Sequence, residues 1–157
     1  MNADREPCPS CGARLGGRAG CQAVFDVLTA MSWTNPVRGR VHKMVVDAYA
    51  MQHPEEYGRS AKSYIRHLSA LGCLIEHPGD HRLYWATPSE SGPPIPPKPA
   101  LLSKRGEITI ADVREVADDE LFQRAVEHWA ASVWAAYAPQ HDLAKGFLAA
   151  LRRVSKL

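Results

Sequence analysis

Three cysteines near the N-terminus constrain this chain more than any other feature. Cys8 and Cys11 belong to the run Cys-Pro-Ser-Cys-Gly, and Cys21 follows after nine intervening residues. A Cys-x-x-Cys pair followed by glycine forms a tight turn in which both thiolates converge on one point. Three sulfurs nearly complete a tetrahedral zinc site, which normally takes four cysteine or histidine ligands. The spacing therefore predicts bound zinc, but it does not predict a reaction.

The rest of the composition is typical of a globular protein. The 157 residues are 45% hydrophobic and 23% charged, which is enough to form one domain with a core. The net charge of +2 is spread evenly along the chain, so nucleic-acid binding is disfavoured. No apolar run approaches the ~18 residues of a membrane span, and the polar N-terminus does not resemble a signal peptide. We therefore expect a cytoplasmic protein with no membrane segment.

In a reducing compartment a Cys-x-x-Cys pair favours a metal over a structural disulfide. The alternative is a redox dithiol. A pair of the thioredoxin type normally follows a strand, and no strand is predicted before Cys8.

Apolar residues recur at helical spacing over most of the chain. They predict helices over residues 22–33, 36–52, 60–75 and 118–137, a short helix after Thr109, and a final helix after Pro139. Thr109 lies three residues before Asp112, as in a capping box. The segment His81–Ala86 alternates weakly and is compatible with a short strand. Pro88–Pro99 holds six of the twelve prolines and predicts an exposed, irregular connection.

The predicted fold is an all-α bundle of about five helices with an N-terminal zinc knuckle and a Pro-rich irregular connection. We expect a single domain, 1–157, made of the zinc knuckle (1–21), a three-helix segment (22–76), the irregular connection (77–107) and the C-terminal helices (108–157). Trp129, Trp134 and Tyr137 should fill the core. The alternative is a ligand pocket walled by these aromatic rings against the Pro-rich segment.

A histidine is expected as the fourth zinc ligand. If the first two long helices pack antiparallel, Cys21 lies level with Tyr49, and His53 lies one turn further, close to the three sulfurs. His42 lies about 16 Å away along the same helix, so both histidines cannot bind one ion. We predict His53; the alternative is that its imidazole caps backbone carbonyls at the helix end. The less favoured candidates are His67 and Cys73, at the far end of the third helix, and His141, which the alignment does not place.

A second group of polar residues lies along the predicted seam between the second and third helices. His42 and Tyr49 share a flank of one helix and His67 lies on a flank of the other, so the two imidazoles could meet there. Such a pair would suit proton transfer or a second metal. The more ordinary interpretation is that each residue is half-buried and makes one hydrogen bond. Asp47 lies on the opposite flank from His42 and is expected to pair with a neighbouring cation.

Several short motifs follow one another along the chain. They are Cys-Pro-x-Cys-Gly, Gly20-Cys21, Val-Asp-Ala-Tyr-Ala-Met-Gln-His-Pro over residues 46–54, His67-Leu68, and a Trp-rich C-terminal helix. In these motifs, which cover most of its length, the chain resembles an uncharacterised bacterial family, a domain of unknown function. The resemblance implies a pattern that includes His42, and it implies no activity, substrate or partner. Similar proteins often carry cysteine five residues after the His-Leu histidine, where this chain has Gly72. That departure favours a histidine as the fourth ligand.

These features predict a zinc-binding helical protein, a binding or regulatory module for another protein or a small molecule, in which the zinc is structural. Three thiolates and one imidazole would leave no coordination position for water. The alternative is a metal-dependent or His-based enzyme that uses the His42/Tyr49/His67 seam. Nucleic-acid recognition through the knuckle is a third possibility that the balanced charge disfavours.

Overall fold

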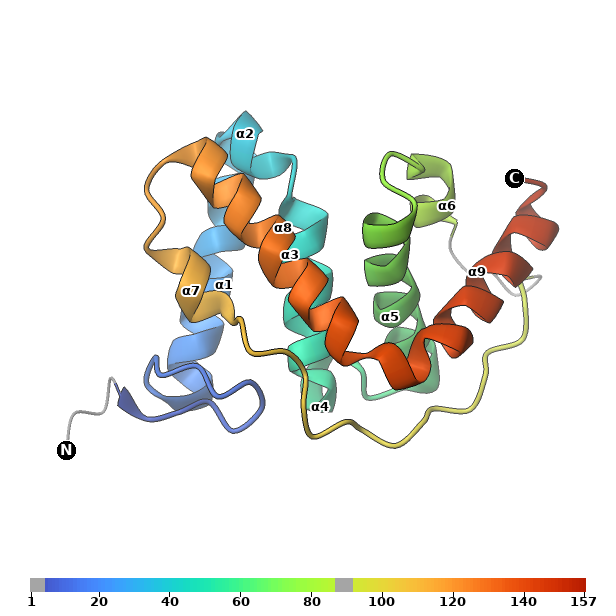
Figure 1. Ribbon diagram of the computed structural model, residues 1–157, viewed down its shortest axis with the longest axis horizontal. Helices are drawn as coiled ribbons and strands as arrows, with labels where there is room; N and C mark the ends of the chain where they lie inside the picture. Colours follow the sequence, from blue (N-terminus) through green and yellow to red (C-terminus); the bar gives the residue numbers. More distant parts are fainter. Residues whose placement is uncertain (1–4, 87–91) are drawn as a thin grey trace.

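The computed structural model describes residues 5–86 and 92–157, and within them the long elements of secondary structure are all helices (Figure 1). The described residues form no strand; one isolated β-bridge pairs Pro7 with Arg14. The long helices are α1 (Gly17–Thr34), α3 (His42–Gln52), α5 (Ala61–Glu76), α8 (Asp119–Ala136) and α9 (His141–Ser155). The short helices are α2 (Pro36–Gly39), α4 (Pro54–Tyr57), α6 (His81–Trp85) and α7 (Ile110–Arg114), and a 3-10 turn, η2 (Ala138–Gln140), joins α8 to α9. The all-α prediction is confirmed, and the five long helices are those that the apolar spacing indicated.

The first helix begins five residues earlier than its apolar pattern suggests. Gly16 takes the left-handed conformation with φ 85° and forms the N-cap, and Gly17 starts α1 at once. No side chain caps this end, so the usual sequence signal for a helix start is missing. As a result Cys21 lies inside the helix rather than in the loop before it.

The predicted helix over 36–52 is interrupted at Arg40 and Val41. The backbone N–H groups of these two residues donate to the carbonyls three residues back, so the chain tightens before α3 begins at His42. Arg38, in α2 just before this break, is buried. Its guanidinium donates to the carbonyls of Val116 and Ala117, which precede α8, and so holds α2 against that part of the chain. A tertiary contact of this kind has no signal in the local pattern.

The weakly alternating segment at 81–86 is a helical turn, α6, and not a strand. Asp80 precedes it, and its carboxylate accepts a hydrogen bond from the Leu83 backbone N–H at 3.0 Å. This is an ordinary N-cap, and it outweighs an alternation of only a few residues. The predicted capping box at Thr109 and Asp112 is present at the start of α7.

Helix α3 lies at the centre of the fold and packs against α1, α5 and α8 (Figure 1). The predicted core aromatics Trp129, Trp134 and Tyr137 are all buried, on α8 and directly after it. The connection from residue 92 to α7 is irregular, as predicted, although Pro93 is buried. Of the predicted Pro-rich connection, residues 87–91 lie outside the described residues. Within the described part of the chain, every helix is too short or too polar to cross a lipid bilayer.

Gln52, the last residue of α3, joins three parts of the fold through hydrogen bonds. Its side chain is fully buried; its amide nitrogen donates to the carbonyls of Arg105 and Ile108 at 3.1 and 2.8 Å, and its amide oxygen accepts from the Trp129 indole at 3.0 Å. Both the amide nitrogen and the amide oxygen of this buried side chain therefore have hydrogen-bond partners. The irregular connection is thereby fixed to α3 and α8.

We expect Gln52→Leu to lower the free energy of unfolding by about 2 kcal/mol, because leucine fills the space but leaves the indole N–H and two carbonyls without partners. Urea denaturation would measure the change. Gln123→Leu, at a half-exposed position on α8, is the matched control and should change stability by less than about 0.5 kcal/mol. Equal stabilities of the two variants would contradict this role of Gln52.

Candidate metal centre

The N-terminal loop, residues 5–16, forms a tight turn around its two cysteines. The Cys8 backbone N–H donates to the Ala13 carbonyl, and the Gly12 N–H donates to the Cys8 carbonyl, both at 2.8 Å. Gly12 has φ +80°, which strongly favours glycine. The Cys-x-x-Cys-Gly pattern therefore has a local cause: glycine reverses the chain directly after Cys11, so that both thiols come from one short turn.

Two helices bring the remaining members of the cluster. Cys21 lies on the second turn of α1, and His53 is the residue that caps the C-terminal end of α3. The N-terminal loop reaches α1 through the Gly17 N–H, which donates to the Glu6 carbonyl at 2.8 Å. His53 leaves the helical conformation because Pro54 follows it.

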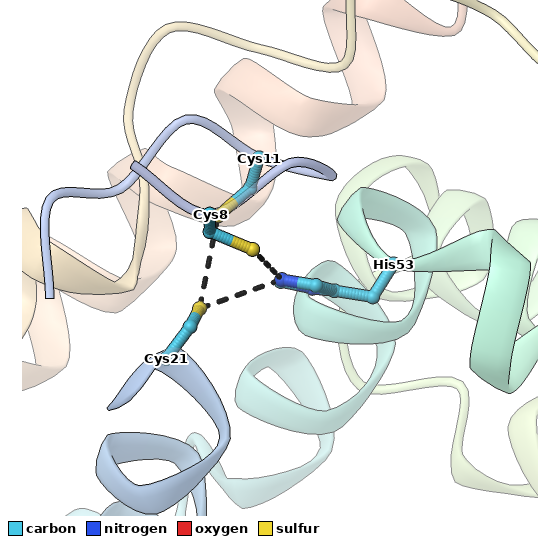
Figure 2. Close-up of side chains that lie close together, drawn as sticks. All are labelled: Cys8, Cys11, Cys21 and His53. Carbon is cyan, nitrogen blue, oxygen red and sulfur yellow. Dashed lines mark hydrogen bonds between the residues drawn. The ribbon is translucent and has the colours of Figure 1, made fainter. Parts of the chain in front are cut away.

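Cys8, Cys11, Cys21 and His53 converge from these three segments and are arranged to hold a metal ion (Figure 2). One ligand atom from each, three Sγ and one imidazole nitrogen, all lie within 4.8 Å of one another. His53 Nε2 lies 3.5 Å from Cys8 Sγ and 3.4 Å from Cys21 Sγ, and the sulfurs of Cys11 and Cys21 are 3.7 Å apart. Only Cys11 is partly exposed; the other three side chains are buried.

The two nitrogens of His53 have different surroundings. Nδ1 lies 2.8 Å from the Tyr49 carbonyl, to which it donates, so in the neutral imidazole the Nε2 lone pair faces the sulfurs. A ligating histidine usually donates its other N–H in this way, which fixes its tautomer and ring orientation. The capping role considered for His53 is therefore also present, but on the other nitrogen.

Tyr49 holds the imidazole in place from one side. Its ring stacks on His53 at 3.9 Å between centroids and on Phe25 of α1 at 4.0 Å. Burial, followed by the adjacent Cys21 sulfur, raises the pKa of Tyr49 well above its usual range, so its hydroxyl remains neutral. A neutral hydroxyl is a hydrogen-bond donor, which suits a neighbouring thiolate.

Cys11 lies in surroundings that favour its neutral thiol. The hydrogen bond with Cys21, followed by burial, raises the pKa of the Cys11 thiol to about 12. The Cys11 thiolate is thus disfavoured unless a positive charge lies beside it. A bound cation would take the place of the Cys11 proton, and its affinity would fall as the pH is lowered.

Two arginines fix the N-terminal loop to the helices beside the cluster. Arg18 pairs with Glu56 of α4 at 2.8 Å and donates to the Ser10 hydroxyl at 3.3 Å. Arg105, from the irregular connection, pairs with Glu55 at 2.6 Å and donates to the Ser10 carbonyl at 3.4 Å. Sequence reasoning did not find Arg105, since it lies 95 residues from Ser10 and no local signal joins the two.

The seam predicted from His42, Tyr49 and His67 is not formed. His42 Nδ1 makes a 2.7 Å hydrogen bond with the Ser32 hydroxyl, whereas Tyr49 stacks on His53. His67 Nδ1 lies 2.8 Å from the Asp47 carboxylate. The two histidines thus have separate partners. Helical spacing placed Asp47 on the flank away from His42, but it did not predict that Asp47 would take His67 as its partner instead of a lysine or arginine.

The other candidate ligands lie outside the cluster. Cys73 is buried on α5 near the Asp80 carbonyl, and the His141 ring stacks on Trp134. Gly72 faces Trp134 so closely that an added Cβ would lie 2.6 Å from the indole ring. A larger side chain at this position would require Trp134 to move.

The structure is that of a helical protein with a Cys3His cluster near its N-terminus that could hold a metal ion. The family of unknown function DUF5946 matches residues 6–138, and the chain belongs to that family. No curated protein and no solved structure matches the chain.

Proposed function

We propose that Cys8, Cys11, Cys21 and His53 bind one zinc ion, and that this zinc is structural. The convergence of their four ligand atoms within 4.8 Å carries the proposal. Zn–S bonds of about 2.3 Å and a Zn–N bond of about 2.05 Å place the corners of a tetrahedron about 3.8 Å apart between sulfurs and about 3.6 Å apart between sulfur and nitrogen. The distances of 3.7, 3.5 and 3.4 Å found among these atoms fit such a site.

The donor set supports a structural rather than a catalytic metal. Three protein ligands and a water are typical of catalytic zinc, whereas four protein ligands leave no position for a substrate. Burial of Cys8, Cys21 and His53 also restricts the access of water. On this proposal the chain is a binding or regulatory module whose N-terminal loop is held to α1 and α3 by the metal.

The test is the metal content and coordination of the purified full chain. We expect one zinc per chain, and the cobalt-substituted protein should show the ligand-field bands of a tetrahedral site with the charge-transfer band of three thiolates. Cys21→Ser should lose the metal. Cys73→Ser is the matched control, because Cys73 is also buried but lies outside the cluster, and it should retain one zinc.

Two results would contradict the proposal. A folded preparation of the wild type that takes up no zinc would exclude the site. A water among the ligands of the bound metal would exclude the structural role, since an open position is typical of a catalytic site.

A further inference from the structure

A cavity of about 370 Å³ lies between α3, α5, α6 and α9, and none of its lining residues belongs to the Cys/His cluster. In Figure 1, α5, α6 and α9 form one side of the molecule and the N-terminal loop lies on the other. The apolar wall of the cavity comes mainly from α6 and α9, through Leu83, Phe147, Leu148 and Leu151. Sites for small molecules usually have volumes of about 300–1,000 Å³ and mostly apolar walls. The cavity is therefore large enough for the apolar part of a small ligand.

The polar side of the cavity is built around a buried carboxylate. Asp47 of α3 has a side chain only 4% exposed, and it accepts hydrogen bonds from His67 Nδ1 at 2.8 Å and from the Tyr84 hydroxyl at 2.9 Å. Burial, followed by the charge of Asp47, raises the pKa of Tyr84, so the phenol stays a neutral donor. Because Nδ1 of His67 is engaged with Asp47, its Nε2 is the nitrogen that can hydrogen-bond a ligand.

The lining of the cavity also carries more positive than negative charge. Lys62 and Arg66 line it from α5, four residues apart and hence on one face of the helix. The side chains of both residues have no ion pair or hydrogen bond within residues 5–86 and 92–157, although the Arg66 backbone carbonyl accepts from the Ser69 hydroxyl. Asp47 is the only acidic residue in the lining, so two cations face one carboxylate and, leaving His67 aside, the formal charge of the lining is +1. The lining therefore favours a ligand with a negative charge.

We propose that this cavity binds a small organic anion with an apolar body. Arg66 and Lys62 pair with the acid group, and Phe147, Leu148 and Leu151 contact the apolar part. This site does not depend on the proposed zinc, so either proposal can fail without the other.

The first test is a titration of the full chain with octanoate, 4-phenylbutyrate and 8-anilinonaphthalene-1-sulfonate in turn, followed by backbone amide NMR. We expect saturable binding of at least one, with shifts concentrated in α5, α6 and α9. The neutral 1-heptanol, which has the same seven-carbon alkyl chain as octanoate, should bind about fivefold more weakly, the size expected for a partly exposed ion pair. Lack of saturable binding by all three anions would overturn the proposal, as would shifts confined to α1 and α7.

Two matched double variants then test the charge. Lys62→Gln with Arg66→Gln should weaken binding of the anion about fivefold or more and leave 1-heptanol binding unchanged. Lys104→Gln with Arg124→Gln has the same net charge and alters two exposed positions outside the cavity, so it should bind like the wild type. Equal effects of the two double variants would show only a general charge effect and would overturn the site. Ala70→Phe, which fills the cavity, should abolish binding of anion and alcohol alike.

Discussion

Replacing His53 with alanine is expected to abolish retention of zinc by the full chain. The variant removes the nitrogen that lies 3.5 Å from Cys8 Sγ and 3.4 Å from Cys21 Sγ, and it leaves three sulfurs in a largely buried site. Loss of an outer partner of a metal ligand weakens affinity by ~10–100-fold, so loss of the ligand itself should exceed ~100-fold. Equilibrium competition with a chromophoric chelator would measure the affinity.

His42→Ala is the matched control on the same helix. Its imidazole bonds to Ser32 and lies beside Trp33, and neither residue belongs to the cluster. This variant should keep its zinc with an affinity within about threefold of the wild type. A loss of zinc by His42→Ala, with retention by His53→Ala, would show that the cluster is not the binding site.

Much of the fold could be predicted because its long helices carry clear apolar spacing. The five long helices were all indicated by recurring apolar residues, with errors mainly at their ends. The start of α1 was missed because Gly16 caps it by backbone conformation alone. The break before α3 was missed because it accompanies contacts of Arg38 with residues almost eighty positions away. Local patterns contain no information on contacts of that range.

The four members of the Cys/His cluster could be anticipated from two simple constraints. Cys-x-x-Cys-Gly is a local turn, so its two thiols converge whatever the rest of the chain does. The length of an antiparallel helix pair then selected His53 over His42, and the structure places His53 beside the sulfurs. The same alignment could not find the contact of Asp47 with His67 and Tyr84. The bond to His67 depends on the rotation of α5 about its axis, and the bond to Tyr84 depends on α6, which the sequence did not identify as a helix.

Removal of the metal should disorder the N-terminal loop while the C-terminal helices persist. Fixing the backbone costs about 1–2 kcal/mol per residue, and residues 5–16 offer little to offset it. Cys8 and Ala13 are the only buried side chains among them, and their described backbone pairing includes one isolated bridge, between Pro7 and Arg14. The ion pairs of Arg18 and Arg105 with α4 are partly exposed and add little. Metal binding would therefore supply the free energy that orders the loop.

Hydrogen exchange with and without a strong chelator tests this expectation. Amides of residues 5–20 should lose their protection in the metal-free chain. Those of α8 and α9 should keep most of theirs, because these helices are held by buried apolar residues such as Trp129, Val133 and Phe147 and contribute no residue to the Cys/His cluster. The Tm should fall by roughly 10 °C, which corresponds to about 3–4 kcal/mol for a chain of this size. Cys73→Ser with its metal should show the protection of the wild type. Unchanged exchange in residues 5–20 after complete removal of the metal would mean that the loop is held by its polar contacts alone, and the structural role of the zinc would then be wrong.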